Sequence, residues 1–238
     1  VEGTNLIEAA LQADYKLDLI FYTEQWQIRH PQLWDKIDEK KVKTQLVDRL
    51  VLEAISTTVN PDGVVATASR PASRVNPTIE HLGLALEKIQ DPGNLGTIIR
   101  TAAATQANGL WLSHNSVDLY SPKVLRSSAG QWFQLPVATG IDLPQLVKQQ
   151  QQQGVQIIAT TAQATETYWE VDFCQPSLIL LGNEGAGLST ELIALADRQI
   201  KIPLANQVES LNVAIASALL LYEAQRQRSI DIDGIDRD

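Results

Sequence analysis

The sequence has no methionine, one cysteine and three histidines among its 238 residues. A single cysteine, Cys174, excludes an internal disulfide, and three scattered histidines do not form the spaced ligand set of a metal site. We therefore expect no metal ion and a reducing, cytoplasmic setting. Because translation starts at methionine and this sequence begins at Val1, we also expect that a short stretch of chain precedes Val1.

Long apolar runs and positive charge are also scarce. No apolar stretch approaches the roughly 20 residues that a membrane-spanning helix needs. The chain has 19 Lys and Arg residues against 28 Asp and Glu residues, which gives a net charge of −9. This balance argues against nucleic acid as a partner, because phosphate contacts need Lys and Arg, although local charge can differ from net charge. Part of the acidity lies in residues 230–238, which we interpret as an acidic tail.

Residues 1–68 are predicted to form a small α/β domain. Apolar residues follow a helical period in residues 6–11 and again in residues 47–54. Short strands are expected at 17–21 and at 64–68, and the turn residues Asn60-Pro61-Asp62-Gly63 precede the second strand.

Residues 69–78 contain Pro and Ser without an apolar period, and we interpret them as the linker to a second domain. The linker arginines, Arg70 and Arg74, suit phosphate as readily as solvent. The basic residues between positions 36 and 49 alternate with acidic ones, which favours a solvated face over an RNA-binding patch.

Residues 79–229 alternate predicted strands and helices, which indicates an α/β domain with a mostly parallel sheet covered on both faces. Strands are expected at 82–86, 109–112, 135–138, 155–160, 178–181 and 200–204, and helices at 95–105, 143–153 and 211–226. Open sheets of this kind bind ligands at the carboxyl ends of their strands. Three polar segments stand at such ends.

The first segment is Asp91-Pro92-Gly93 followed by a helix. Asp-Pro-Gly favours a tight turn, and Asn94 is a suitable N-cap for the helix. Arg100 falls in the second helical turn. These residues alone leave open a plain capped helix with a solvent-facing arginine.

The second segment runs from the apolar strand at 178–181 into Gly182-Asn183-Glu184-Gly185-Ala186-Gly187. Its glycines permit close approach of the backbone to a ligand. The spacing fits neither the dinucleotide fingerprint nor the phosphate loop, and Glu184 would repel a phosphate. The loop therefore suits a ligand with a cationic centre, or one bound through backbone groups.

The third segment begins at Ile202-Pro203 and leads through a polar loop into a helix rich in small residues. Ser210 is a plausible N-cap of that helix. The small residues Ala214, Ala216, Ser217 and Ala218 allow close packing, either within the chain or across a dimer interface.

Together, N-x-G-x-x-x-R, G-N-E-G-x-G and I-P…S-L-N-V resemble, in this order, the three motifs of the SpoU/TrmH family of knotted RNA methyltransferases. The resemblance covers most of residues 78–228. It implies a parallel-sheet α/β domain with a deep trefoil knot, preceded by a small α/β substrate-binding domain. It also implies transfer of a methyl group from S-adenosylmethionine to a ribose 2′-hydroxyl of structured RNA by a homodimer.

The resemblance also assigns residues to roles. The implied catalytic residues are Arg100, Asn94, Glu184, Ser210 and Asn212, with Asn94 and Glu184 orienting Arg100 or the RNA. The implied cofactor-binding residues are Thr160, Thr161, Leu181, Gly182, Asn183, Gly185, Ile202, Pro203, Leu211 and Val213. We expect a basic RNA-binding stripe from Arg70, Arg74, Lys123 and Arg126.

Arg100 is often proposed in this family to help deprotonate the 2′-hydroxyl. Because arginine stays protonated in proteins, we favour a charged clamp on the adjacent phosphate. Asn206 stands where many relatives have Gly. Asn tolerates the left-handed backbone region better than most residues, so we expect the loop to keep its shape.

Ribosomal RNA is the expected substrate rather than transfer RNA, because the N-terminal domain resembles that of the ribosomal-RNA branch. Two other classes remain open at this stage. One is a knotted RNA-binding protein without turnover, and the other is a nucleotide-dependent enzyme with an ordinary doubly wound fold. The absence of phosphate-binding fingerprints argues against the latter.

Overall fold

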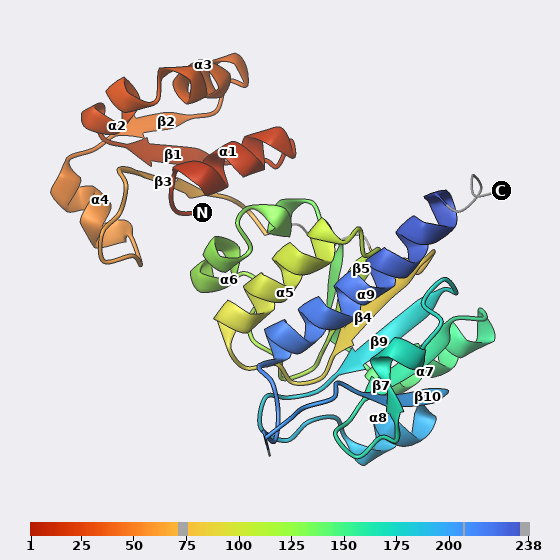
Figure 1. The fold of residues 1–238 in the computed structure, drawn as a ribbon. Coiled ribbons are helices and arrows are strands. Elements are labelled where there is room, and N and C mark those ends of the chain that lie inside the picture. Colours follow the sequence, from red (N-terminus) through yellow and green to blue (C-terminus); the bar gives the residue numbers. More distant parts are fainter. Residues whose placement is uncertain (71–75, 207, 234–238) are drawn as a thin grey trace.

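A computed structural model describes residues 1–70, 76–206 and 208–233, which form two α/β domains in chain order (Figure 1). Arg74 and the last five residues of the expected acidic tail lie outside the described residues.

The N-terminal domain is a three-stranded sheet packed with helices. Its elements are α1 (Thr4–Gln12), β1 (Leu19–Tyr22), α2 (Glu24–Arg29), α3 (Pro31–Glu39), β2 (Thr44–Leu46), α4 (Arg49–Ile55) and β3 (Val64–Thr67). The strand order is β2-β1-β3, with β1 parallel to β2 and antiparallel to β3. Its core includes Ile7, Ile20 and Trp26, each at most 1% exposed.

The C-terminal domain has a seven-stranded sheet in the order β6-β5-β4-β9-β7-β10-β8, and every neighbouring pair is parallel. The strands are β4 (Leu82–Leu86), β5 (Gly109–Ser113), β6 (Val137–Ile141), β7 (Gln156–Thr160), β8 (Glu166–Thr167), β9 (Ser177–Leu181) and β10 (Arg198–Lys201). The helices are α5 (Pro92–Ala104), α6 (Pro122–Ser127), α7 (Leu143–Gln152), α8 (Thr190–Leu195) and α9 (Val213–Asp233), with 3-10 turns η1 (Gln131–Phe133) and η2 (Tyr168–Glu170).

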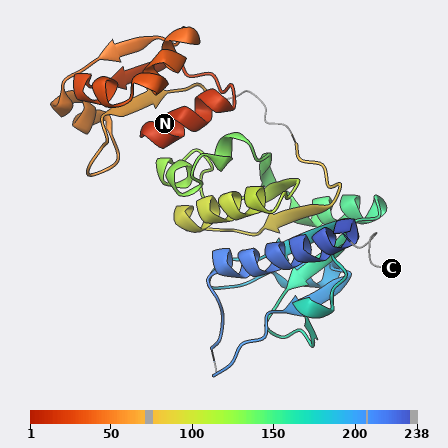
Figure 2. The ribbon, with the colours of Figure 1, turned by 45° about the horizontal axis from the view of Figure 1, so that its top comes forward.

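Helices cover both faces of this sheet (Figures 1 and 2). Side chains from α5, α6 and α9 join one apolar cluster, and those from α7 and α8 join a second cluster on the opposite face. All five residues of β4 and of β9 are buried, as expected for strands covered on both sides. The parallel, doubly covered sheet predicted from the sequence is therefore confirmed.

Several element boundaries differ from the sequence-based prediction; β1, for example, begins at Leu19 and α5 at Pro92. The last strand ends at Lys201, because Pro203 has no N–H to donate to a sheet ladder. The strand predicted at 135–138 is β6, which begins at Val137. The final helix begins at Val213 and continues to Asp233, so the first residues of the predicted tail are helical.

Candidate active site

The first two polar segments begin side by side at the centre of the sheet. β4 and β9 are parallel neighbours, and their last residues, Leu86 and Leu181, are register partners. The strand order also reverses at this position, since β5 and β6 lie beyond β4 while β7 lies beyond β9. Such a switch point is where open α/β sheets form a ligand crevice.

The helix α5 is capped by Asp91 and not, as predicted, by Asn94. The Asp91 carboxylate accepts hydrogen bonds from the backbone N–H groups of Gly93 (2.6 Å) and Asn94 (3.0 Å), and Pro92 takes the first helical position. The bond from the Asn94 N–H is the main cause that lowers the pKa of Asp91. Because Asp91 supplies the cap, the Asn94 side chain is available for other contacts.

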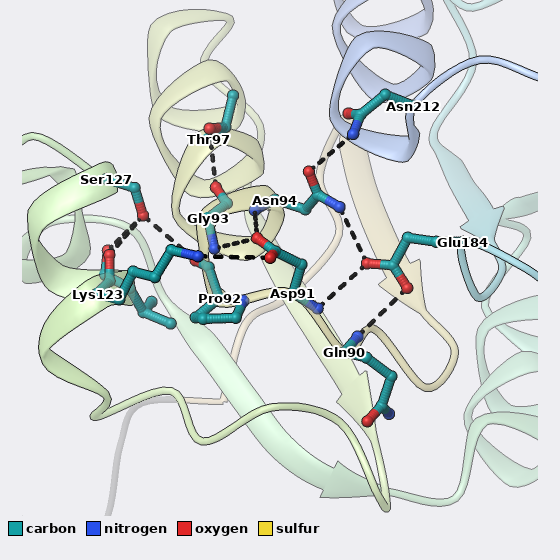
Figure 3. A network of polar contacts seen from close by, with 11 residues as sticks. Gln90, Asp91, Pro92, Gly93, Asn94, Thr97, Lys123, Ser127, Glu184 and Asn212 are labelled. Atoms are coloured by element: carbon teal, nitrogen blue, oxygen red, sulfur yellow. Dashed lines mark hydrogen bonds and ion pairs between the residues drawn. The ribbon is translucent and has the colours of Figure 1, made fainter.

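Asn94 links all three segments (Figure 3). Its Nδ2 donates to Glu184 Oε1 at 3.0 Å, and its Oδ1 accepts from Asn212 Nδ2 at 2.9 Å. Glu184 also accepts from the backbone N–H groups of Asp91 (3.3 Å) and Gln90 (3.4 Å). One chain of hydrogen bonds therefore fixes the start of α5, the loop after β9 and the start of α9 relative to one another.

This bonding keeps the carboxylate of Glu184 ionised. Partial burial by itself raises its pKa, but the hydrogen bonds from Asn94 and from the backbone outweigh burial and leave the pKa below its ordinary value. The glycine loop therefore carries the negative charge of Glu184, which disfavours binding of a phosphate there and favours binding of a cationic group.

The loop after β9 is folded tightly on itself. Asn183 and Gly187 exchange backbone hydrogen bonds of 3.1 and 2.9 Å, and the Asn183 side chain accepts from the N–H groups of Gly185 and Ala186. A Cβ on Gly182 would overlap the backbone of Gly187 and Leu188, so only glycine fits there. A Cβ on Gly185 would meet only Asn183 Oδ1, at 3.6 Å.

The third segment is an irregular loop that ends at Asn212. Asn212, and not the predicted Ser210, caps α9, because its Oδ1 accepts from the N–H of Ala214 at 2.9 Å. Ser210 is exposed. Asn206 has φ = 56°, in the left-handed region that Asn tolerates better than most residues.

The residues predicted to bind the cofactor come from neighbouring strands. β9, β7 and β10 are consecutive in the sheet, so their carboxyl ends share one edge. At or just after these ends, or at the start of α9, lie Thr160, Thr161, Leu181, Gly182, Asn183, Gly185, Ile202, Pro203, Leu211 and Val213. Thr160 Oγ1 donates to the carbonyl of Leu180 at 2.9 Å, which ties β7 to β9.

Arg100 does not join the network. It lies six residues after Asn94, which is about 120° around the helix, and its side chain is exposed. Within residues 1–70, 76–206 and 208–233, the Arg100 side chain has no hydrogen bond or ion pair. Asn94 and Glu184 therefore hold each other and do not orient Arg100 within this chain.

Three of the four residues predicted as a basic stripe have acidic partners, and the fourth, Arg74, lies outside the described residues. Lys123 Nζ lies 3.5 Å from Asp91, Arg126 pairs with Glu2 at 2.9 Å, and Arg70 pairs with Asp118 at 3.0 Å. The Arg126–Glu2 pair joins the two domains, and the Arg70–Asp118 pair joins the linker to the C-terminal domain, so both arginines contribute to how the domains dock.

Sequence reasoning missed Glu87, a buried carboxyl group that is 8% exposed. Its Oε2 accepts from the N–H of Ser189 at 2.7 Å, and its own N–H donates to Leu181 at 2.9 Å. Glu87 therefore holds both ends of the glycine loop. Its position directly after a buried strand was the available signal, since that edge of the sheet carries the functional loops.

In the described part of the chain, no three His, Cys, Asp or Glu side chains gather as a metal site would require. Among the described helices, none has the length and apolar character needed to cross a membrane.

Comparison with known families matches both domains. Residues 81–222 match the SpoU rRNA Methylase family, and residues 1–73 match the RNA 2′-O ribose methyltransferase substrate-binding domain. The first match covers more than half of the chain.

Similar proteins match over nearly the whole length. An uncharacterized tRNA/rRNA methyltransferase of Synechocystis is 49% identical over 96% of this chain and 84% of its own length. The 23S rRNA (guanosine(2553)-2′-O)-methyltransferase RlmP of Bacillus subtilis is 31% identical over 93% and 86%. The crystal structure of the SpoU methyltransferase AviRb of Streptomyces viridochromogenes with AdoMet (S-adenosylmethionine) has a TM-score of 0.84 at 30% identity, covering 96% and 90%. The chain therefore belongs to the SpoU family of RNA methyltransferases.

Proposed function

We propose that this protein transfers a methyl group from S-adenosylmethionine to a ribose 2′-hydroxyl of ribosomal RNA. The hydrogen-bond chain Glu184–Asn94–Asn212 carries the proposal, because it joins the three family motifs at the switch point of the sheet. The N-terminal domain match and the 23S rRNA activity named for RlmP support an RNA substrate of the ribosomal class.

The chemistry of the third loop fits the cofactor. The backbone N–H groups of Leu204, Glu209 and Leu211 have no hydrogen-bond partner among the described residues. Half-buried Ile202 and Leu211 supply apolar surface in the same segment. Adenosine offers ring nitrogens that accept hydrogen bonds and an apolar face, so backbone donors beside apolar side chains suit it.

Glu184 and Arg100 have different roles in this proposal. Bound S-adenosylmethionine supplies a methyl group on a cationic sulfonium, and an ionised Glu184 is compatible with that charge. Arg100, free of acidic partners in the described chain, holds the phosphate next to the acceptor ribose and stabilises the negative charge that forms on the 2′-oxygen. Ser210 and Asn212 shape the loop near the methyl donor.

A homodimer is part of the proposal. Ile215, Leu219 and Tyr222 form an apolar stripe on α9, and they are 53%, 38% and 53% exposed. Their spacing of four and three residues puts them on one face of the helix. With Tyr168 and Ala218 they line a hollow of about 440 Å³, a concave apolar surface that a second copy of the chain would cover.

The rest of the proposal follows from the family. The C-terminal domain carries the deep trefoil knot that the family resemblance implies. The N-terminal domain spans residues 1–68, and the C-terminal domain spans residues 79–229. We also infer that the protein acts in the cytoplasm, since its single cysteine fits a reducing compartment.

Calorimetry with S-adenosylmethionine and S-adenosylhomocysteine is the direct test. We expect micromolar binding by the wild type and loss of binding in Gly182→Val, which forces the loop open. Methyl transfer to in vitro transcripts of 23S rRNA, 16S rRNA and transfer RNA then identifies the substrate class. No cofactor binding by the folded wild type would exclude the proposed methyltransferase activity. Methyl transfer to transfer RNA alone would reject ribosomal RNA as the substrate.

A further inference from the structure

The interface between the two domains is held by charged and aromatic contacts at three points. α6 and η1 of the C-terminal domain face α1 and the first residues of the chain (Figure 2). At this interface lies Arg126, which the sequence assigned to RNA.

Arg126 is held in a cluster with Glu2 and Thr57. Its Nη1 donates to Glu2 Oε2 and to Thr57 Oγ1, both at 2.9 Å. Glu2 Oε1 in turn accepts from the Thr57 N–H at 2.9 Å, and Glu2 Oε2 accepts from the Thr57 hydroxyl at 3.0 Å. The Glu2 side chain is 9% exposed and that of Arg126 is 33% exposed, so this pair is shielded from water more than an ordinary surface pair.

Two further contacts flank the cluster. The ring of Tyr15 packs against those of Trp132 and Phe133, at centroid distances of 5.6 and 5.1 Å. Arg70 pairs with Asp118 at 3.0 Å, and its guanidinium lies 4.4 Å from the ring centroid of Tyr120. The N-terminal domain is therefore docked along one side of the C-terminal domain.

α6 also contacts the helix that carries Arg100. Gly96 of α5 lies so close to α6 that a Cβ there would overlap Ser127 Oγ and stand 2.7 Å from the Val124 carbonyl. One face of α6 thus holds the N-terminal domain through Arg126, while the other supports α5. α6 therefore contacts both the N-terminal domain and the helix that carries Arg100.

We propose that Arg126 is a positioning residue that locks the N-terminal domain onto α6, and that it does not contact RNA phosphate. The proposal rests on the proposed function, because the locked arrangement fixes how far the RNA bound to the N-terminal domain lies from the methyl-transfer site. Glu2 is its partner in this role.

Substitution of Glu2 separates the two roles of Arg126. If Arg126 locks the domains, Glu2→Gln and Arg126→Gln both raise KM for a 23S rRNA transcript, by about three- to tenfold, because a shielded ion pair is broken. The double variant is then no worse than Arg126→Gln, since both changes remove one interaction. Affinity for S-adenosylmethionine stays unchanged.

A phosphate contact would give the opposite pattern. Removal of the acidic Glu2 would leave RNA binding unchanged or tighter, and only Arg126→Gln would weaken it, with a salt dependence reduced by about one phosphate contact. That result would overturn the proposal. Glu53→Gln is the matched control, because Glu53 pairs with Arg49 within α4 of the N-terminal domain.

Hydrogen exchange tests the lock without any enzyme assay. The Thr57 N–H is bonded to Glu2, so Arg126→Gln, in the other domain, is expected to increase its exchange rate several-fold, as does Glu2→Gln. Unchanged exchange in both variants rejects the lock. If the wild type transfers no methyl group to any RNA, the proposed function fails, and the exchange measurement still decides whether the lock exists.

Discussion

Asn94 Nδ2 donates a hydrogen bond to Glu184 Oε1 over 3.0 Å, although 90 residues separate them along the chain. The same Asn94 accepts from Asn212 through its Oδ1. An amide carries its donor and its acceptor on separate atoms, so it can donate to a carboxylate and accept from a second amide at the same time. The two bonds therefore fix which way Asn94 points and hold three loops together.

Asn94→Asp is expected to lower stability at pH 7 by about 1–2 kcal/mol, because it sets a carboxylate against Glu184 and removes a donor. Urea unfolding followed by circular dichroism measures the change. Asn5→Asp, on the exposed surface of α1, adds the same charge away from the network and should stay near wild type. Equal stability of the two variants would mean that the network contributes nothing to folding.

The network also predicts a pH dependence. The pKa of Glu184 in the folded protein lies below its ordinary value of 4.5, so its ionised form stabilises the fold above that value. The stabilisation is lost as the pH falls below 4.5 and through the folded pKa. Wild type is therefore expected to be more stable than Glu184→Gln at pH 7, with the difference shrinking as the pH falls below 4.5 in denaturant titrations. A constant difference across this range would refute the assignment.

Gly96→Ala is expected to destabilise the protein by about 1–3 kcal/mol, because the added methyl group overpacks the contact between α5 and α6. Ser127→Gly, which removes the overlapping hydroxyl, should restore part of that loss, while the Val124 carbonyl prevents full recovery. Thermal unfolding of the single and double variants measures both effects. Full tolerance of Gly96→Ala would show that the helices separate easily.

Arg100→Ala is expected to reduce kcat by at least about a hundredfold, because it removes charge stabilisation at the reacting oxygen. Since Arg100 is exposed and without a partner in the described chain, stability should change by no more than about 0.5 kcal/mol, and calorimetry should find cofactor affinity unchanged. Thr97→Ala, on the same exposed side of α5, is the control. Near-normal turnover by Arg100→Ala would remove Arg100 from the mechanism.

Ile215→Asp should convert a dimer into a monomer, because it places a charge in the apolar stripe of α9. Light scattering after size-exclusion chromatography measures the mass. Ile28→Asp, at a residue 71% exposed on α2, tests whether any exposed apolar residue has the same effect. A monomeric wild type, or a dimer that survives Ile215→Asp, would contradict the proposed interface.

The sequence alone predicted the two domains, the parallel sheet and the position of the three motifs after strands. These rest on local signals: apolar strands that need cover on both faces, turn residues between them and helical periodicity. The left-handed Asn206 was also predictable, because the preference of Asn for that region is intrinsic to the residue.

Other features depend on contacts between distant segments. Asn94 looked like a helix cap, but Asp91 capped α5 and left the Asn94 amide to bond with Glu184. Ser210 likewise looked like the cap of α9 until Asn212 took that position. In both cases two neighbouring residues could cap the helix nearly equally well. A few hydrogen bonds from other loops therefore decide which residue becomes the cap.

The basic residues also show what the sequence predicts and what only the tertiary structure decides. From the sequence, Arg70, Lys123 and Arg126 were candidates for RNA binding, because phosphate contacts need basic residues. Only the tertiary structure placed a carboxylate within 3.5 Å of each, because ion pairing depends on which surfaces meet when the domains dock. Arg100, without such a partner in the described chain, was left available for the substrate.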